Sequence, residues 1–97
     1  NYVIITLGSK GAALVTKGKA ELIPAIKVVA IDTTAAGDSF IGAVASNLGK
    51  RELNYENLKE AITFGNKVSS IVVQRSGAQP SIPTKKEVIN IYGEDNN

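Results

Sequence analysis

The chain has 97 residues, of which 43% are hydrophobic and 21% charged, and this composition is typical of one small globular unit. It contains no cysteine and no histidine, which excludes disulfides, zinc sites, cysteine nucleophiles and Ser-His-Asp catalysis. A net charge of +2 is too small to predict a nucleic-acid partner or an anionic membrane partner. The longest apolar runs, such as 28–31 and 71–73, fall far short of the about 18 residues that cross a bilayer.

The first residues predict that the chain is a segment of a longer, cytoplasmic protein. It opens at Asn1 without a methionine and runs directly into residues 2–7, an apolar and β-branched stretch. No charged region with a cleavage site precedes this stretch, so no signal peptide is visible. Consecutive apolar residues favour a strand that is covered on both faces, as in the middle of an α/β sheet. We therefore expect a buried strand over residues 2–7.

An antiparallel β-meander is expected to continue from this strand. The pattern predicts, in chain order, a turn, a second strand, a polar connection and a third strand, at residues 8–11, 12–16, 17–19 and 20–23. Residues 28–31 are expected to form a further short strand that leads into the segment 32–40. The first third of the chain is thus predicted to be mainly β.

Helical spacing replaces the β pattern after residue 36. Apolar residues predict a helix over 36–48 that ends before Gly49, at Phe40, Ile41, Val44 and Leu48. Asn54 is placed to cap a second helix that runs to about residue 73, with Gly65 as a local weak point. A Gly-, Ser- and Pro-rich loop over 74–83 precedes a short final helix through residue 92, whose capping box runs from Thr84 to Glu87. Residues 93–97 are expected to fray. The sequence therefore predicts an α/β fold, a β-meander followed by helices.

Carboxylates are the only plausible proton acceptors in a chain without histidine and cysteine. Seven of the nine lie in polar surroundings, at Glu21, Glu52, Glu56, Glu60, Glu87, Glu94 and Asp95. Asp32 and Asp38 instead bracket a run of small residues between an apolar strand and an apolar helix, where burial and a helix N-terminus can tune a pKa. These two acids are the candidates for catalysis.

The small residues between the two acids suit a bound phosphate. Ala35, Ala36 and Gly37 at the expected helix start offer backbone N–H groups that have no intrahelical acceptor. The helix dipole adds to these donors, so charge that develops on a transferred phosphoryl group would be stabilised there. Asp38 could accept the proton of an attacking hydroxyl. Equally, Asp32 or Asp38 could simply cap the helix while the small residues allow tight packing.

Three stretches resemble motifs of the ribokinase family, also called the PfkB or carbohydrate kinase family. Asp32-Thr33-Thr34-Ala35-Ala36-Gly37-Asp38-Ser39-Phe40 resembles its C-terminal signature, usually D-T-x-G-A-G-D, with Ala35 where many members have glycine. Gln74-Arg75-Ser76-Gly77-Ala78-Gln79-Pro80-Ser81-Ile82-Pro83 resembles its R-x-G-A-Q-x-S-x-P loop. Thr6-Leu7-Gly8-Ser9-Lys10-Gly11-Ala12 resembles its T-x-G-x-x-G nucleotide stretch, although such a turn is often only a hairpin. The resemblance implies the C-terminal part of a ribokinase-like three-layer α/β/α domain, without the sugar-binding half and the lid.

Carried over position by position, the resemblance implies the roles of several residues. Asp38 would be the base that activates the sugar hydroxyl, and the amides of Ala35, Ala36 and Gly37 would form the anion hole. ATP would bind along Thr6, Leu7, Gly8, Ser9, Lys10 and Gly11, against Gly37, and beside Asn66 on the second helix. Asn66 could equally be a solvated surface residue.

The resemblance also implies two metal ions. A monovalent cation, usually K⁺, would be held by oxygens from both loops, with ligands at Asp32, Thr34, Val72, Arg75, Gly77 and Ser81. Oxygen-only ligation suits a hard cation. Thr34, Val72, Arg75 and Gly77 would contribute main-chain carbonyls, whereas Asp32 would contribute its carboxylate. Asp32 could instead cap its loop. Mg²⁺ would travel with the ATP phosphates, and its protein ligands are expected outside this chain.

The activity that the resemblance implies is ATP-dependent phosphorylation of a sugar hydroxyl, with D-ribose converted to ribose 5-phosphate. It belongs to the longer parent protein, a homodimer through a lid that this chain lacks, and the 97 residues alone are expected to be inactive. Three alternatives stay open: a kinase for adenosine, fructose or a vitamin alcohol, a non-catalytic nucleotide-binding module, and a purely structural fragment. Asp38 argues against a pure binder, which needs no carboxylate beside the transferred phosphate.

Overall fold

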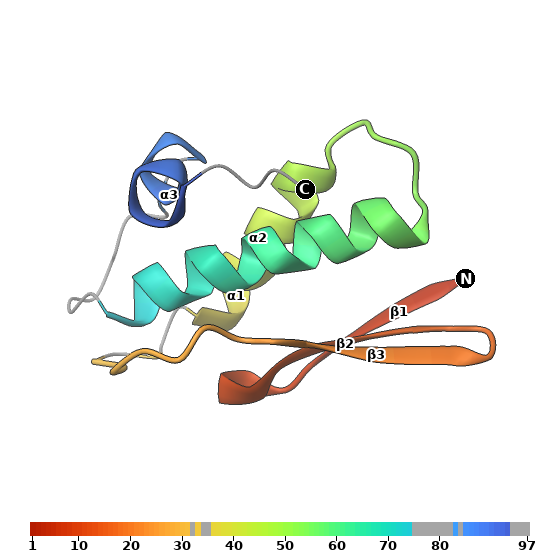
Figure 1. Cartoon of the computed structure of the whole chain (residues 1–97), viewed down its shortest axis with the longest axis horizontal. Coiled ribbons are helices and arrows are strands. Elements are labelled where there is room, and N and C mark those ends of the chain that lie inside the picture. The colour runs from red at the N-terminus through yellow and green to blue at the C-terminus, as the bar shows by residue number, and fades with distance from the viewer. Residues whose placement is uncertain (32, 34–35, 75–82, 84, 94–97) are drawn as a thin grey trace.

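The structure, a computed structural model, describes residues 1–31, 33, 36–74, 83 and 85–93. A three-stranded sheet is followed by three helices, in the order β1 (Tyr2–Thr6), β2 (Gly11–Thr16), β3 (Lys19–Pro24), α1 (Ala36–Leu48), α2 (Tyr55–Val73) and α3 (Lys85–Tyr92). A single 3-10 turn over Gly8–Lys10 joins β1 to β2. Figure 1 shows the helices stacked on one side of the sheet, with α2 lying along it.

The sheet is the predicted antiparallel meander, with β2 in the middle. Opposite pairs such as Ile4 and Leu14 in β1 and β2 put apolar side chains on the face that meets α2. The core between the sheet and the helices consists of Ala12, Leu14, Ile23, Phe40, Val44, Leu58, Ala61 and Ile62. Alternating side chains of the strands thus supply one half of the core, and the apolar stripes of α1 and α2 supply the other.

The prediction that residues 2–7 form a strand covered on both faces is wrong for this chain. β1 lies at the edge of the sheet, and Val3 and Ile5 are 53% and 46% exposed on the face away from the helices. Tyr2 and Ile4, which alternate with them, pack against the core. The helices among the described residues cover only one face of the sheet (Figure 1), which leaves the other face uncovered.

The prediction of a strand over residues 28–31 is also wrong. This segment runs without strand pairing, and Val29 and Ile31 are 84% and 64% exposed. Its backbone is hydrogen-bonded instead to the end of α2, where the Ile31 N–H donates to the Val73 carbonyl at 2.6 Å. Apolar, β-branched composition alone does not make a strand where no neighbouring strand offers a ladder.

The helices begin and end where the sequence predicts. Asn54 caps α2, since its Oδ1 accepts the Asn57 N–H at 2.9 Å, and Gly49 follows α1 with a φ of 51°. Gly65 has a packing role in addition to its low helix propensity, because it lies against Phe40 and Val44 of α1. The capping box predicted at Thr84 and the fraying predicted for residues 94–97 lie outside the described residues.

The described ranges of the chain contain the helices α1, α2 and α3. None of the helices there combines the length and the apolar composition that a bilayer span requires.

Candidate functional site

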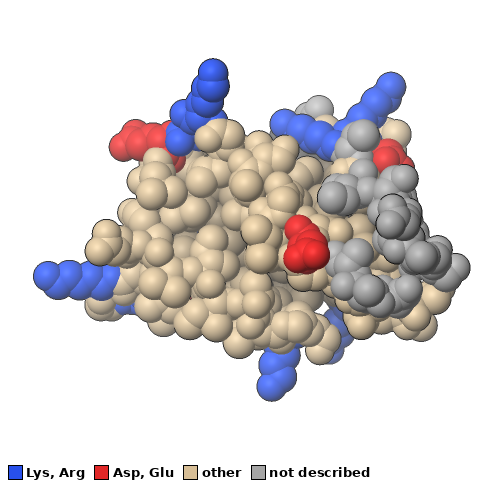
Figure 2. All heavy atoms as spheres, turned by 180° about the vertical axis from the view of Figure 1, so that it is seen from behind, with Lys and Arg blue, Asp and Glu red and all other residues tan. Residues whose placement is uncertain are grey.

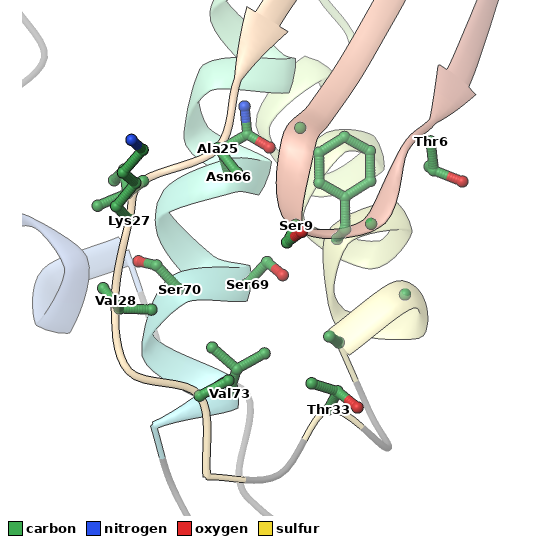
Figure 3. A pocket seen from close by; sticks show the side chains of 17 residues that line it. Thr6, Ser9, Ala25, Lys27, Val28, Thr33, Asn66, Ser69, Ser70 and Val73 are labelled. Carbon is green, nitrogen blue, oxygen red and sulfur yellow. The ribbon is translucent and has the colours of Figure 1, made fainter.

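The structure contains a cavity with a volume of about 610 Å³, and we call it the main pocket. Its walls come from the turn after β1, the segment 25–30, the first residues of α1 and one face of α2. In Figure 3, Asn66 and Thr33 lie on opposite sides of this cavity. A volume of this size lies within the usual range of pockets that hold a small-molecule cofactor or substrate.

Most of the predicted nucleotide-binding residues line the main pocket. Gly8 and Ser9 come from the turn, Thr6 and Gly11 from the strand ends beside it, Gly37 from α1 and Asn66 from α2. Leu7 and Lys10 are not among the lining residues, but their backbones hold the turn in place. The Leu7 N–H donates to the Gly11 carbonyl at 2.8 Å, and the Lys10 carbonyl accepts from Ala25 at 3.3 Å. The turn is therefore a β-hairpin connection and a pocket wall at once.

Gly11 is required where the turn meets the exit of β3. Its φ is 109°, and a Cβ at this position would lie 2.2 Å from the Ile23 carbonyl oxygen and 2.6 Å from the Ala25 nitrogen. Only glycine accepts both this backbone angle and this close approach. The second glycine of the Gly-x-x-Gly turn thus brings the turn against the segment that forms the next wall.

The start of α1 carries the predicted anion hole and the predicted base. Ala36 and Gly37 line the main pocket, and the Ala36 N–H donates to the Thr33 carbonyl at 3.2 Å. This amide is engaged in the structure, so an anion-binding role for it requires that bond to be replaced. Ala35 lies outside the described residues.

Asp38 is an exposed residue in the first turn of α1. It is the third residue of the helix, so it does not occupy the N-cap position that the capping alternative requires. It does not line the main pocket, but it follows Gly37, which does. A carboxylate in the first turn is favoured by the helix dipole, and its exposure leaves it accessible to a second substrate.

Asn66 is buried rather than solvated, which corrects the alternative of a surface residue. It is 5% exposed, and its Nδ2 donates to the carbonyls of Ile23 at 3.2 Å and Pro24 at 3.1 Å. Two carbonyl partners require the nitrogen end of the amide, so the orientation of the side chain is fixed by its contacts. Asn66 therefore holds the end of β3 against α2 at the pocket wall.

The predicted cation ligands fall mostly outside the described residues, namely Asp32, Thr34, Arg75, Gly77 and Ser81. Val72 is described and is 1% exposed, and its carbonyl accepts from the Gln74 N–H at the end of α2. The bond between Ile31 and Val73 places the residues just before the two predicted ligand loops side by side. No cluster of three or more acidic, histidine or cysteine side chains that could hold a metal occurs in the described part of the chain.

Sequence reasoning missed one face of α2. Ser69, Ser70 and Val73 line the main pocket three, four and seven residues after Asn66, which is the spacing of one helix face. In Figure 3 the Ser69 hydroxyl points towards the cavity, and the Ser70 hydroxyl points away from it. Ser70 Oγ lies 2.7 Å from the Lys67 carbonyl and 2.6 Å from the Tyr92 hydroxyl of α3. Helix spacing counted from Asn66 would have found these residues.

Charged side chains are few among the described residues that line the main pocket. Lys27 is the one charged residue among the described residues that line it. Figure 2 shows basic side chains projecting from the edge of the molecule, while most of that face is uncharged. The cavity wall is thus mainly apolar, with scattered hydroxyl and amide groups, as is usual for small-molecule sites.

Comparison with known proteins gives the family. The model of the pfkB family carbohydrate kinases matches residues 1–85. A ribokinase from Staphylococcus aureus (strain COL) is 56% identical over 86 residues, which make up 89% of this chain and 27% of that protein. The chain therefore spans about a quarter of the length of this relative.

Solved structures agree with the sequence match. The crystal structure of ribokinase from Thermotoga maritima superposes with a TM-score of 0.83 at 44% identity, covering 97% of this chain and 30% of its own. A fructokinase double mutant from Vibrio cholerae O395, crystallised with fructose, ADP and potassium ion, gives a TM-score of 0.82 at 26% identity and covers 92% of this chain and 29% of its own. These neighbours confirm the predicted fold class, part of a ribokinase-like α/β domain. The chain belongs to the pfkB family of carbohydrate kinases.

Proposed function

We propose that the full-length protein carrying this segment transfers the γ-phosphoryl group of ATP to a hydroxyl of D-ribose and forms ribose 5-phosphate. The observation that carries this proposal is the main pocket, which gathers Thr6, Gly8, Ser9 and Gly11, the start of α1 and Asn66. The exposed Asp38 follows Gly37 at this start of α1. The 56% identity to a ribokinase supports ribose as the acceptor. The fructokinase with bound fructose and ADP makes fructose the second candidate.

The proposed arrangement of ATP follows from the chemistry of the pocket wall. The base and its sugar pack on the apolar wall between residues 25–30 and α2, and the phosphates point to the start of α1. Backbone N–H groups and the helix dipole favour negative charge there. Ala35, Ala36 and Gly37 are the proposed donors to the transferred group, and the bond from Ala36 to Thr33 must open for this contact.

Asp38 is the proposed general base. Its carboxylate takes the proton of the acceptor hydroxyl while that oxygen forms a bond to the γ-phosphorus. The bond from the γ-phosphorus to its bridging oxygen breaks, and ADP leaves with the electron pair. Mg²⁺ bound to the phosphates would offset their negative charge, with its protein ligands outside this chain.

The most direct test of the proposed function is a panel of acceptors offered to the purified full-length protein with ATP and Mg²⁺. Product analysis by ³¹P NMR is expected to show ribose 5-phosphate formed in a one-to-one ratio with ADP. A clear preference for fructose or adenosine would replace ribose within the same family. ATP binding without phosphorylation of any acceptor would support the nucleotide-binding module instead.

A monovalent cation site is also part of the proposal, at Asp32, Thr34, Val72, Arg75, Gly77 and Ser81. Its support is the family resemblance, the potassium ion in the fructokinase structure and the adjacent Ile31 and Val73, which precede the two ligand loops. K⁺ is expected to raise the kcat of the full-length protein by about 10-fold or more over Li⁺, which is too small for such a site. Equal rates in KCl and LiCl at matched ionic strength would contradict the cation site.

We further propose that the full-length protein is a cytoplasmic homodimer. Its dimer contact would lie in lid strands outside this chain, so the mass of the full-length protein in solution tests the assembly.

A further inference from the structure

Gly65 of α2 packs directly against α1. A Cβ on Gly65 would be 2.8 Å from Val44 Cγ2 and 2.9 Å from Phe40 Cδ1 and Cε1. Real Cβ atoms essentially never approach other heavy atoms this closely, so any larger residue at 65 must displace a neighbour. Both neighbours belong to α1, and they lie one helical turn apart.

The displacement that relieves both contacts is a movement of α1 as a whole. Phe40 and Val44 are 6% and 8% exposed, so neither side chain can turn into solvent. Val44 is β-branched, and such residues keep one strongly preferred rotamer in a helix. A rotation of the Phe40 ring alone would leave the contact with Val44 in place. Since interiors are densely packed, α1 must shift away from α2.

α1 is the element that carries the proposed chemistry. Gly37 lines the main pocket, Phe40 lines it as well, and Asp38 stands between them in the first turn. A shift of α1 therefore moves the proposed base and the phosphate-binding amide together, relative to a nucleotide held by the rest of the pocket.

The opposite wall of the pocket is held by the next residue of α2. Asn66 Nδ2 donates to the carbonyls of Ile23 and Pro24, and Pro24 leads directly into the segment 25–30. Adjacent residues of one helix thus contact both walls. A change at Gly65 moves the α1 wall and leaves the Asn66 contacts with β3 unchanged.

We propose that Gly65 is a positioning residue for phosphoryl transfer, which sets the distance of Asp38 and Gly37 from the bound nucleotide through its contact with Phe40 and Val44. The inference rests on the proposed function. Helix propensity alone would favour alanine at position 65, because alanine is the better helix former. The proposed positioning role gives a reason for glycine there.

The test is a comparison of kcat and ATP binding in the full-length protein. Gly65→Ala is expected to lower kcat by about 10-fold or more, because displacements of about 1 Å near a reacting centre can cost a factor of about 100. The dissociation constant of a non-hydrolysable ATP analogue is expected to change by less than about 3-fold, since most of the wall stays in place. The assays are run well below the melting temperature of each variant, so that unfolding does not contribute to a fall in kcat.

A second background, in which the side chains that contact position 65 are shortened, separates positioning from other effects of Gly65→Ala. We call it the relieved background. In Phe40→Ala/Val44→Ala, the atoms that would contact the new Cβ are removed, so Gly65→Ala is expected to change kcat by less than about 2-fold there. Gly42→Ala is the matched control, because this helical glycine of α1 has no atom within 4 Å of an added Cβ. It is expected to leave kcat unchanged.

Two outcomes would overturn the proposal. One is an unchanged kcat in Gly65→Ala, and the other is an equal loss of kcat in the native and relieved backgrounds. Failure of the proposed function is distinguishable, because it shows in the unmodified protein as absence of sugar phosphorylation. Melting temperatures of the same variants test the contact independently of catalytic activity. Gly65→Ala must lower the melting temperature more in the native background than in the relieved background.

Discussion

Gly11 is the residue at which the turn after β1, the end of β3 and the main pocket meet. Gly11→Ala is expected to lower the free energy of unfolding by more than about 2 kcal/mol, since the methyl group meets backbone atoms and φ is positive. Gly18→Ala is the matched control, because Gly18 has a φ of 75° but open space around it, and a loss of about 1 kcal/mol is expected. Urea unfolding of the full-length protein measures both. Equal losses would show that the close approach to Ile23 carries no cost.

Asn66 illustrates how far a single residue can be predicted from the sequence. It follows Ile62 by four positions, so the helix spacing indicates the buried face. Its partners, the carbonyls of Ile23 and Pro24, lie more than 40 residues away in the sequence. No local pattern specifies such a contact, because it depends on how β3 and α2 pack.

At the scale of elements, the helices were predictable and the exposure of the strands was not. Caps such as Asn54 and the apolar spacing of α1 and α2 are local signals, and both helices lie where these signals put them. Whether β1 is covered on one face or two depends on the layers around it. Residues 28–31 have strand-like composition but no strand pairs with them. The presence or absence of a pairing strand cannot be read from a local stretch of sequence.

β3 and the first turns of α2 are joined by a small polar cluster around Glu21. The Tyr55 hydroxyl donates to Glu21 Oε1 at 2.5 Å, Lys59 Nζ lies 2.8 Å from Oε2, and Lys19 Nζ lies 3.9 Å from the centre of the Tyr55 ring. The hydrogen bonds from Lys59 and Tyr55 lower the pKa of Glu21. The hydrogen bond to Glu21 raises the pKa of Lys59 and raises the pKa of Tyr55 to about 12.

These shifts predict a pH dependence of stability with a defined sign. The depressed pKa of Glu21 gives stability above its ordinary value of 4.5 that is lost as the pH falls through the folded-state pKa. The raised pKa values of Tyr55 and Lys59 give stability below pH 10 that is lost as the pH rises through their folded-state values.

The advantage in melting temperature of the native protein over Glu21→Gln should therefore be largest between about pH 5 and pH 10 and shrink on both sides. The matched control is Glu52→Gln, at an exposed carboxylate outside this cluster. A difference between native protein and Glu21→Gln that stays constant from about pH 3 to pH 11 would contradict the cluster.

At the scale of the whole molecule, the sheet presents an apolar face that the helices in the described part of the chain do not cover. Val3, Ile5 and Leu22 are 53%, 46% and 54% exposed there. A contiguous apolar face of this kind indicates a missing partner surface. The 97-residue chain, expressed alone, is expected to show no ribose-dependent ADP formation in a coupled assay. Turnover by the isolated chain would contradict the expectation that the sugar-binding half is required.

The sequence predicted the parts of the site better than their assembly. The turn after β1 and the start of α1 were recognisable as motifs, because their chemistry depends on adjacent residues such as Gly8 to Gly11 and Gly37-Asp38. That these stretches share one cavity, together with Ser69 and the segment 25–30, follows from the fold. The acceptor site could not be derived, since the chain spans about a quarter of a ribokinase.

The account as a whole depends on Asp38 as the group that takes the proton during transfer. The decisive measurement is kcat, together with the affinity for ATP, in Asp38→Asn of the full-length protein. Glu56→Gln is the control, because Glu56, like Asp38, is an exposed carboxylate in the first turn of a helix, and it does not line the main pocket. We expect Asp38→Asn to lose about 100-fold or more of kcat with ATP affinity retained, and Glu56→Gln to keep its kcat. An Asp38→Asn variant that keeps most of its kcat would contradict the account.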